Sequence, residues 1–428
     1  MSADYPEHWL IKPLDEVMEA IIDYRGKTPQ KTDCGIPLIT AKIVKNGRIE
    51  TPEEFIAESQ YSSWMVRGLP RAGDVVVTTE APLGEIAQLD DSNVALAQRI
   101  VTLRGKEGIL NNDYLLYLMQ SSYVQDQLES RASGSTVKGI KQSELRKILL
   151  PIPPEDEQVE IAKHLKALDK KVEVNRQINQ SLEQMAQAIF KSWFVDFDPV
   201  RAKIAGRQPE GMSATTAVIF PEELMESELG FIPKGWGWST IGEEVEVLGG
   251  GTPSTQEEKF WAGGQFNWAT PKDLSGLNDK VLLGTERRVT QAGLDKISSG
   301  LLPINVVLMS SRAPVGYLAI AKVPVAINQG FIAMRCEKIL PPEYVLQWTS
   351  FSINDIKLRA SGTTFAEISK KTFRPIPVLV PEGEVLSEFC RVVAPLYEKI
   401  ALLAEESRSL AVARSALLPK LFSGQMKV

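Results

Sequence analysis

The chain has few of the residues that most often carry metal or nucleophilic chemistry. It contains two histidines, His8 and His164, and three widely spaced cysteines, Cys34, Cys336 and Cys390. Zinc sites and Cys–His nucleophile pairs need several such side chains close together. We therefore predict neither kind of site, and we expect both histidines at the surface. Scattered cysteines in odd number are typical of a reducing cytoplasm without a disulfide framework.

Several kinds of segment are also missing. No apolar run reaches the roughly 18 residues of a membrane span, and the N-terminal Met-Ser-Ala-Asp-Tyr-Pro-Glu has neither the basic end nor the apolar core of a signal peptide. There is no Gly-Lys-Ser/Thr phosphate loop, and the glycines at 249–251 lack the spacing of a nucleotide-binding fingerprint. We expect a cytoplasmic protein with no membrane partner, no metal, no cofactor in this chain and no catalytic residue.

Charged residues are present in ordinary proportion, but their balance is acidic. Of 428 residues, 43% are hydrophobic and 24% are charged, and the formal net charge is −6. This length is enough for two or more domains with sizeable cores. Because the chain as a whole is acidic, any contact with nucleic acid must come from local basic patches.

The most regular stretch runs from Glu155 to Phe194 without a glycine or proline. Its apolar and amide residues recur at alternating steps of four and three, the heptad pattern of a coiled coil. Carboxylates at 155–157 fall in the first turn, where they suit the helix dipole. About 38 residues rising about 1.5 Å each predict a rod of roughly 55 Å. The seam consists of Ile161, Leu165, Leu168, Val172, Asn175, Asn179, Leu182, Ala186, Ile189 and Trp193.

The same seam recurs 228 positions later, so the chain repeats a globular part followed by a long helix. Two seamed helices in one chain predict an antiparallel pair. The amides at 175 and 179 lie in mid-seam, where polar residues fix register and partner. The second seam consists of Phe389, Val393, Leu396, Ile400, Leu403, Ser407, Leu410, Arg414, Leu417 and Leu421.

One residue interrupts the second helical pattern. Pro395 stands where the first helix has Ala167. A proline inside a helix costs about 3 kcal/mol and usually kinks it. We therefore expect a bend or a short break near Ala394, after which the seam continues.

The parts outside the two helices mix strands and helices irregularly, which predicts an α+β class with an internal pseudo-two-fold repeat. Expected strands lie at 36–40 and 74–79, then through Ile86 and Leu89 after a turn at 80–84, and at 95–103, and expected helices lie at 112–129 and 343–358. The predicted organisation is a domain at 1–150, a helix at 151–195, a loop-rich connector at 196–232, a second domain at 233–378 and a helix at 379–428.

Matching motifs align the two globular parts. The pairs are Thr28-Pro29 with Thr252-Pro253, 38–42 with 268–272, 78–84 with 310–316, Gln98 with Gln329, and 131–136 with 359–364. The number of positions between matching residues of the two parts varies before residue 131, but it stays at 228 from residue 131 onward. Loops on a domain tolerate insertions, whereas paired helices must keep their register.

Basic clusters recur at matching places, with six basic residues in 25–48, five in 131–147 and four in 359–374. Paired basic modules suit contact with DNA phosphates, and adjacent polar side chains suit base edges. The alternative is that the clusters are solvated surface and that the polar residues only cap helices and brace loops. The predicted DNA-binding residues are Arg25, Lys27, Thr40, Lys42, Thr79, Glu80, Gln98, Ser135, Lys138, Thr270, Lys272, Ser311, Arg312, Gln329, Thr363 and Thr364.

The predicted length of the helices suggests what two such modules are for. A rod of roughly 55 Å compares with about 34 Å per turn of DNA. Two dissimilar modules held at a fixed spacing therefore fit an asymmetric bipartite site, in which two short sequences flank an unread gap.

Nearly the whole chain resembles the DNA specificity subunit of type I restriction-modification systems. The motifs that carry the resemblance are LPIPPEDEQ at 150–158, SWFVDFDPV at 192–200, the Ser-Gly-Thr-type loops at Gly134 and Gly362, and LLPKLFSG at 417–424. The resemblance implies two target-recognition domains that bind double-stranded DNA, and spacer helices that dock two modification subunits, which are N6-adenine methyltransferases. It also implies restriction subunits, with S-adenosylmethionine, ATP and Mg on those partners and no chemistry in this chain.

A competing hypothesis of another class is a tandem-repeat coiled-coil scaffold or inhibitor that binds proteins through its helices without DNA contact. A gel shift with mixed duplex DNA, with and without the neighbouring methyltransferase, separates the two hypotheses.

Overall fold

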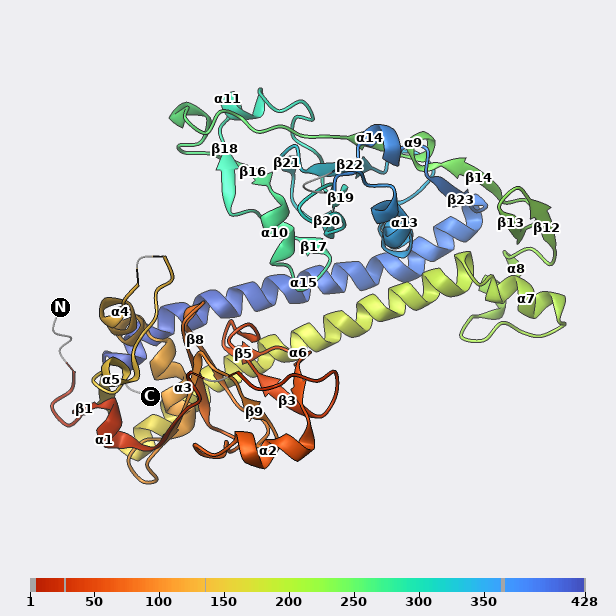
Figure 1. Cartoon of the computed structure of the whole chain (residues 1–428). Helices are drawn as coiled ribbons and strands as arrows, with labels where there is room; N and C mark the ends of the chain where they lie inside the picture. Colours follow the sequence, from red (N-terminus) through yellow and green to blue (C-terminus); the bar gives the residue numbers. More distant parts are fainter. Residues whose placement is uncertain (1–4, 27, 135, 363–365, 427–428) are drawn as a thin grey trace. The chain divides into compact units, whose positions relative to one another are not determined.

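A computed structural model describes residues 5–26, 28–134, 136–362 and 366–426. The chain divides into two compact units: unit 1 is Met1–Val172 with Ser409–Val428, and unit 2 is Glu173–Arg408. Two helices of 40 residues, α6 (Glu155–Phe194) and α15 (Gly383–Phe422), contribute a segment to each unit (Figure 1). The first helix coincides with the stretch from Glu155 to Phe194 that lacks glycine and proline, and residues 151–152 of the predicted helical segment belong instead to a strand.

Unit 1 is built on two small sheets. A four-stranded antiparallel sheet has the order β2-β10-β7-β8, and a three-stranded sheet has the order β6-β3-β9, with β3 and β9 parallel. The Val- and Thr-rich strand β7 is buried along its whole length, as its β-branched composition favours. The strands of these sheets are β2 (Met18–Asp23), β3 (Ile36–Ile39), β6 (Phe55–Ile56), β7 (Val75–Thr79), β8 (Leu83–Gln88), β9 (Ala95–Leu96) and β10 (Ile100–Gly105).

Short elements complete unit 1. Helices α3 and α4 contact β8, and the strand pair β1–β11 adjoins the start of α6. These elements are β1 (Leu10–Pro13), α1 (Leu14–Val17), β4 (Val44–Lys45), β5 (Arg48–Ile49), α2 (Glu58–Trp64), α3 (Asn112–Gln120), α4 (Ser122–Arg131), α5 (Gln142–Leu145) and β11 (Leu149–Ile152).

Two expected elements of unit 1 are each divided in two. The strand predicted at 95–103 becomes β9 and β10 because Arg99 adopts a left-handed φ of 72°, which turns the chain from one sheet into the other. The helix predicted at 112–129 becomes α3 and α4, because Ser121 has extended φ and ψ and its hydroxyl caps the second helix.

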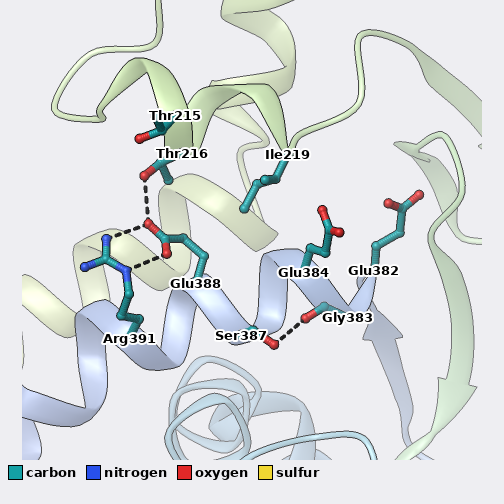
Figure 2. A pocket seen from close by; sticks show the side chains of 9 residues that line it. All are labelled: Thr215, Thr216, Ile219, Glu382, Gly383, Glu384, Ser387, Glu388 and Arg391. Carbon is teal, nitrogen blue, oxygen red and sulfur yellow. Dashed lines mark hydrogen bonds and ion pairs between the residues drawn. The ribbon is translucent and has the colours of Figure 1, made fainter.

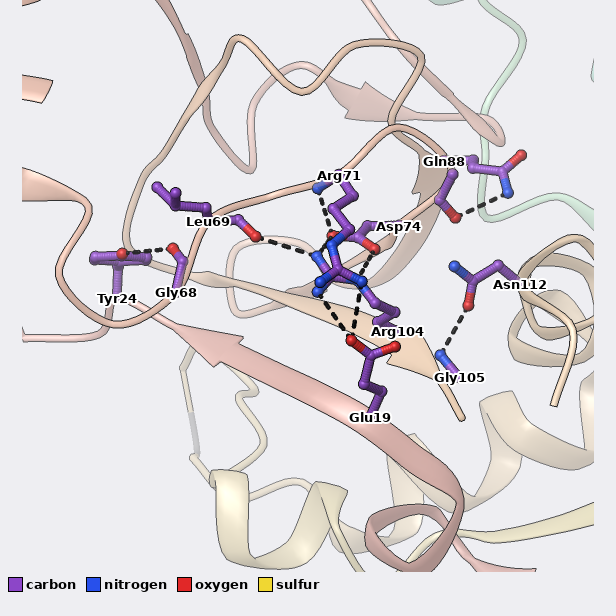
Figure 3. Close-up of polar contacts among 11 residues, drawn as sticks. Glu19, Tyr24, Gly68, Leu69, Arg71, Asp74, Gln88, Arg104, Gly105 and Asn112 are labelled. Atoms are coloured by element: carbon purple, nitrogen blue, oxygen red, sulfur yellow. Dashed lines mark hydrogen bonds and ion pairs between the residues drawn. The ribbon is translucent and has the colours of Figure 1, made fainter. Parts of the chain in front are cut away.

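A buried ion pair fixes the centre of unit 1. The Asp74 side chain is 1% exposed and accepts two hydrogen bonds of 2.7 Å from the Arg104 guanidinium, as Figure 3 shows. Glu19 adds a second carboxylate 3.6 Å from Arg104, and the Leu69 carbonyl accepts from the same guanidinium. The pair therefore joins β2 and β10 to the loop that precedes β7.

Unit 2 repeats this arrangement. Its larger sheet has the order β15-β22-β19-β20-β17, and its three-stranded sheet has the order β18-β16-β21, with β16 and β21 parallel. The strands of these sheets are β15 (Glu246–Leu248), β16 (Phe266–Ala269), β17 (Val281–Leu282), β18 (Arg287–Val289), β19 (Val307–Ser310), β20 (Leu318–Ala321), β21 (Val325–Ile327) and β22 (Phe331–Arg335). The other elements are β14 (Gly237–Thr240), α9 (Ile241–Glu244), η1 (Glu258–Phe260), α10 (Pro271–Ser275), α11 (Gln291–Leu294), α12 (Pro342–Phe351), α13 (Ile353–Leu358), α14 (Lys370–Phe373) and β23 (Pro377–Val380).

The segment after α6 is more ordered than the loop-rich excursion that its composition suggests. It forms α7 (Asp198–Ile204), α8 (Ala214–Val218) and the hairpin of β12 (Leu224–Ser227) with β13 (Gly230–Pro233). Phe197, Val200 and Phe220 are buried in the core of unit 2. Apolar residues spaced irregularly among Gly, Pro and Ser carry no periodic signal, so the sequence does not indicate this packing.

A polar contact also holds this segment against the first turns of α15. Figure 2 shows the Thr216 hydroxyl donating to the Glu388 carboxylate at 2.7 Å, while Arg391 donates to the same carboxylate at 2.6 and 2.7 Å. These bonds lower the pKa of Glu388 to about 2, with the contact to Arg391 the largest cause.

The predicted seams are buried or half-buried along both helices. In unit 2, Asn175 contacts Leu403 and Ser407, and Asn179 donates to the Ile400 carbonyl. Residue numbers fall along α15 as they rise along α6, so the two segments run antiparallel there.

Unit 1 has its own link between the two long helices. Arg414 of α15 pairs with Asp169 of α6, with the two atoms 2.8 Å apart.

The break expected near Ala394 does not occur. Helix α15 continues through Pro395, which lies on its exposed face. The Arg391 carbonyl that loses its amide partner there can be hydrated. No helix in the described part of the chain has the length and apolar character to cross a membrane.

Candidate nucleic-acid interface

The candidate site of unit 1 forms where two parallel strands end side by side. β3 and β9 pair through Leu38 with Ala95 and Ile39 with Leu96, and the Ala97 amide donates to the Ile39 carbonyl at 2.9 Å. The residues that follow these strands therefore meet. They line a cavity of about 170 Å³, here called recess 1, whose polar members are Thr28, Lys31, Thr40, Lys42, Glu54, Gln98 and Arg99.

The predicted Ser-Gly-Thr-type loop packs beside the turn after β7. The Ile140 amide donates to the Thr79 carbonyl at 3.0 Å, and Gly139 forms bridges with Glu80 and Ser133. Unit 2 repeats this contact: the Ile368 amide donates to the Ser311 carbonyl at 3.0 Å, and Glu367 bridges to Arg312 and Ser361. In both units the fold therefore joins two motifs that are more than 45 residues apart in the sequence.

The predicted residues of unit 1 occupy different environments. Lys42 and Lys138 are exposed, with 79% and 62% of their side chains accessible, and Gln98 and Glu80 are half-buried. Thr79 is 1% exposed, so its side chain faces the core rather than a ligand.

Other residues of the same predicted set have structural partners or fall outside the described chain. Arg25 pairs with Asp23 at 2.7 Å and donates to the Ile140 carbonyl at 2.8 Å, so it braces the 131–140 loop. Lys27 and Ser135 lie outside the described residues.

Two predicted residues of unit 2, Thr270 and Gln329, follow the corresponding strand ends, where the Asn328 amide donates to the Ala269 carbonyl at 3.0 Å. Thr270 caps α10, and Gln329 is exposed and accepts a hydrogen bond from the Thr252 hydroxyl. Lys272 is 77% exposed and pairs with Glu286 at 2.8 Å, a contact that raises the pKa of Lys272.

The remaining predicted residues of unit 2 divide between the core, the surface and the undescribed loop. Ser311 is buried, whereas Arg312 is 37% exposed at 3.7 Å from Glu367. Thr363 and Thr364 lie outside the described residues.

Sequence reasoning missed Lys31, Glu54 and Arg99 in recess 1. Lys31 donates to the Glu54 carboxylate, with the two atoms 2.8 Å apart, and this bond lowers the pKa of Glu54. Glu54 reaches the recess because β6 pairs with β3, and Arg99 because the chain turns after β9. Strand pairing of this kind has no local sequence signal.

The arrangement suits contact with a nucleic acid. An exposed lysine and a half-buried or exposed glutamine follow the strand ends in each unit, and such groups suit phosphate and base-edge contacts. In the residues that the structure describes, no group of three or more His, Cys, Asp and Glu side chains is placed to hold a metal ion.

Comparison with known proteins identifies related chains. The family model of the type I restriction modification DNA specificity domain matches this chain twice, at residues 6–184 and 233–410. The specificity subunit of the type I restriction enzyme HindI of Haemophilus influenzae is 27% identical over 380 residues, covering 79% of this chain and 82% of the relative.

Two further relatives cover almost the whole chain. The MjaIX specificity subunit of Methanocaldococcus jannaschii is 25% identical, covering 99% of this chain and 94% of its own. The solved S subunit of a type I restriction-modification system from M. genitalium has the same fold, with a TM-score of 0.55, 15% identity and coverage of 99% and 97%.

Proposed function

Because the chain belongs to the type I restriction-modification DNA specificity family, we propose that it is the sequence-specific DNA-binding subunit of such a complex. The observation that carries the proposal is that the family's domain matches twice, once on each repeat. Each repeat binds one half of a bipartite site. The two halves differ in sequence, because the side chains around the corresponding strand ends differ.

The proposed organisation has target-recognition domains at 1–150 and 233–378. The helices at 151–195 and 379–428 form an antiparallel coiled coil that spaces the domains and sets the unread gap, and 196–232 connects the halves. The heptad seams and the contacts of Asn175 and Asn179 support this arrangement.

The proposed contacts divide by chemistry. Exposed cations bind phosphates, and half-buried or exposed amide, hydroxyl and carboxylate groups bind base edges. The phosphate-binding set is Lys42, Lys138, Lys272 and Arg312, and the base-edge set is Thr40, Glu80, Gln98, Thr270 and Gln329. Thr79 and Ser311 are left out of both sets because they are buried.

We further propose that this chain is non-catalytic and works in the cytoplasm. It would dock two modification subunits that methylate adenine at N6, together with restriction subunits. S-adenosylmethionine, ATP and Mg would be bound by those partners. The names of the related specificity subunits support this assignment.

The deciding experiment is a map of N6-methyladenine across the host genome with this gene intact and deleted. We expect deletion to erase methylation at one asymmetric, two-part motif and to leave other motifs unchanged. An identical map in both strains would contradict the proposal and favour the protein-binding scaffold, which a gel shift of the assembled complex on duplex DNA would then test.

A further inference from the structure

The strand that borders each candidate site carries opposite charges at equivalent positions. In unit 1, Ile56 pairs with Ile36, and Glu54 lies two residues before Ile56 on the same face. In unit 2, Val289 pairs with Phe266, the counterpart of Ile36, and Arg287 lies two residues before Val289. The register therefore places a carboxylate in recess 1 where unit 2 has a guanidinium.

Arg287 is held on an aromatic platform. Its guanidinium carbon lies 3.7 Å from the centre of the Trp261 ring and 5.2 Å from that of Trp268. The two indoles meet edge to face, with their centres 4.9 Å apart. Stacking fixes the plane of a guanidinium while leaving its edge open to donate hydrogen bonds.

The platform adjoins the predicted site of unit 2. Trp268 is buried at 3% exposure, and its indole N–H donates to the Gly251 carbonyl at 3.1 Å. The next residue, Thr252, donates to Gln329. Arg287 itself is exposed, and the neighbouring carboxylate of Glu286 is already paired with Lys272.

We propose that Arg287 is a specificity-determining residue of the second module and selects guanine at one position of its half-site. A planar fork of N–H donors matches the N7 and O6 acceptors that guanine presents in the major groove. The first module, with Glu54 at this position, makes no such selection. This inference rests on the proposed DNA-binding function and adds to it one residue and one base.

The experiment is selection from a duplex DNA library with two randomised segments, using the full chain assembled with its modification subunit. The variants are R287Q, which removes the charge, and R287K, which keeps the charge but loses the fork. Arg288 is exposed on the opposite face of β18, so R288Q is the matched control.

We expect wild type and R288Q to enrich the same bipartite motif. R287Q should lose preference for one guanine in one half-site by about tenfold or more, while the other half-site is unchanged, and R287K should lose less of it because an ammonium can still donate to guanine O6 and N7. If R287Q keeps the wild-type motif, or weakens binding to all sequences equally, Arg287 does not read a base and the inference is overturned. If wild type enriches no motif, the proposed function itself fails.

Discussion

At the scale of single residues, some charged side chains of this protein are buried in ion pairs and others are exposed at the surface. The Arg104–Asp74 pair is buried and hydrogen-bonded, and it organises the sheet of unit 1. Lys42 and Lys272 are mostly exposed, and a surface ion pair such as Lys272 with Glu286 contributes little to stability. Their proposed role is therefore phosphate contact rather than stabilisation of the fold.

Replacing Lys272 with alanine should weaken DNA binding by the assembled complex. Because one phosphate contact is lost, the slope of log K against log salt concentration should become shallower by about one. Titrations at several salt concentrations measure this slope. Lys234 is similarly exposed and paired with Glu223, but it lies in the β13–β14 region away from the strand ends, so K234A should leave the slope unchanged. An unaltered slope for K272A would remove Lys272 from the interface.

Glu388 gives a pH-dependent contribution to stability. Its pKa is lowered from 4.5 to about 2, so the carboxylate stabilises the fold fully above pH 4.5 and loses this effect as the pH falls towards 2. E388Q should therefore unfold at lower urea than wild type at pH 7, and the difference should shrink between pH 4.5 and 2. The exposed Glu384 lies in the same helix turns, and E384Q serves as the control. A difference that does not depend on pH would show that Glu388 acts through its shape alone.

At the scale of elements, sequence pattern predicted best what is long and periodic. The bounds of α6 follow from an uninterrupted heptad and an acidic first turn. The division of the chain at Arg99 and Ser121 was not predicted, because a single dihedral change or a single cap does not disturb the surrounding apolar pattern. Recess 1 could be predicted only in part. Thr40 and Gln98 belong to repeated motifs, but Glu54 lines the recess only because β6 pairs with β3.

Pro395 allows a direct test of proline within an unbroken helix. P395A restores a backbone amide donor to α15, which stabilises the helix by up to about 3 kcal/mol. It also gives the unfolded chain more conformational entropy, which lowers the free energy of unfolding by about 1 kcal/mol. We expect a net gain of about 1–2 kcal/mol in the free energy of unfolding, measured by urea titration. The reverse change at the equivalent exposed position, A167P, should cost about 3 kcal/mol or more. If P395A instead lowers the free energy of unfolding, Pro395 stabilises the protein rather than destabilising it.

At the scale of the whole molecule, unit 1 is assembled from both ends of the chain. Leu418, Leu421 and Phe422 are buried with residues of 9–165, and the Phe422 ring lies 5.3 Å from that of Tyr114. Unit 2, in contrast, is one continuous segment.

Shortening Phe422 should therefore loosen a part of the chain some 250 residues or more away in sequence. F422A should cost about 3–5 kcal/mol in the free energy of unfolding of unit 1. Limited proteolysis followed by mass spectrometry should find new cleavage sites within residues 5–172 before any in unit 2. L402A, at a 67% exposed position of the same helix, is the control. Equal protection of F422A and wild type would show that the C-terminal residues do not complete unit 1.

This division between the ends has a consequence for biosynthesis. A ribosome releases the chain from its N-terminus, and domains generally fold as they emerge. Residues 1–172 cannot complete unit 1 until residues 409–428 have been translated, which is after the whole of unit 2. Until residues 409–428 have been translated, Tyr114 lacks the Phe422 ring that packs against it, and the apolar surface of the incomplete unit is exposed to aggregation.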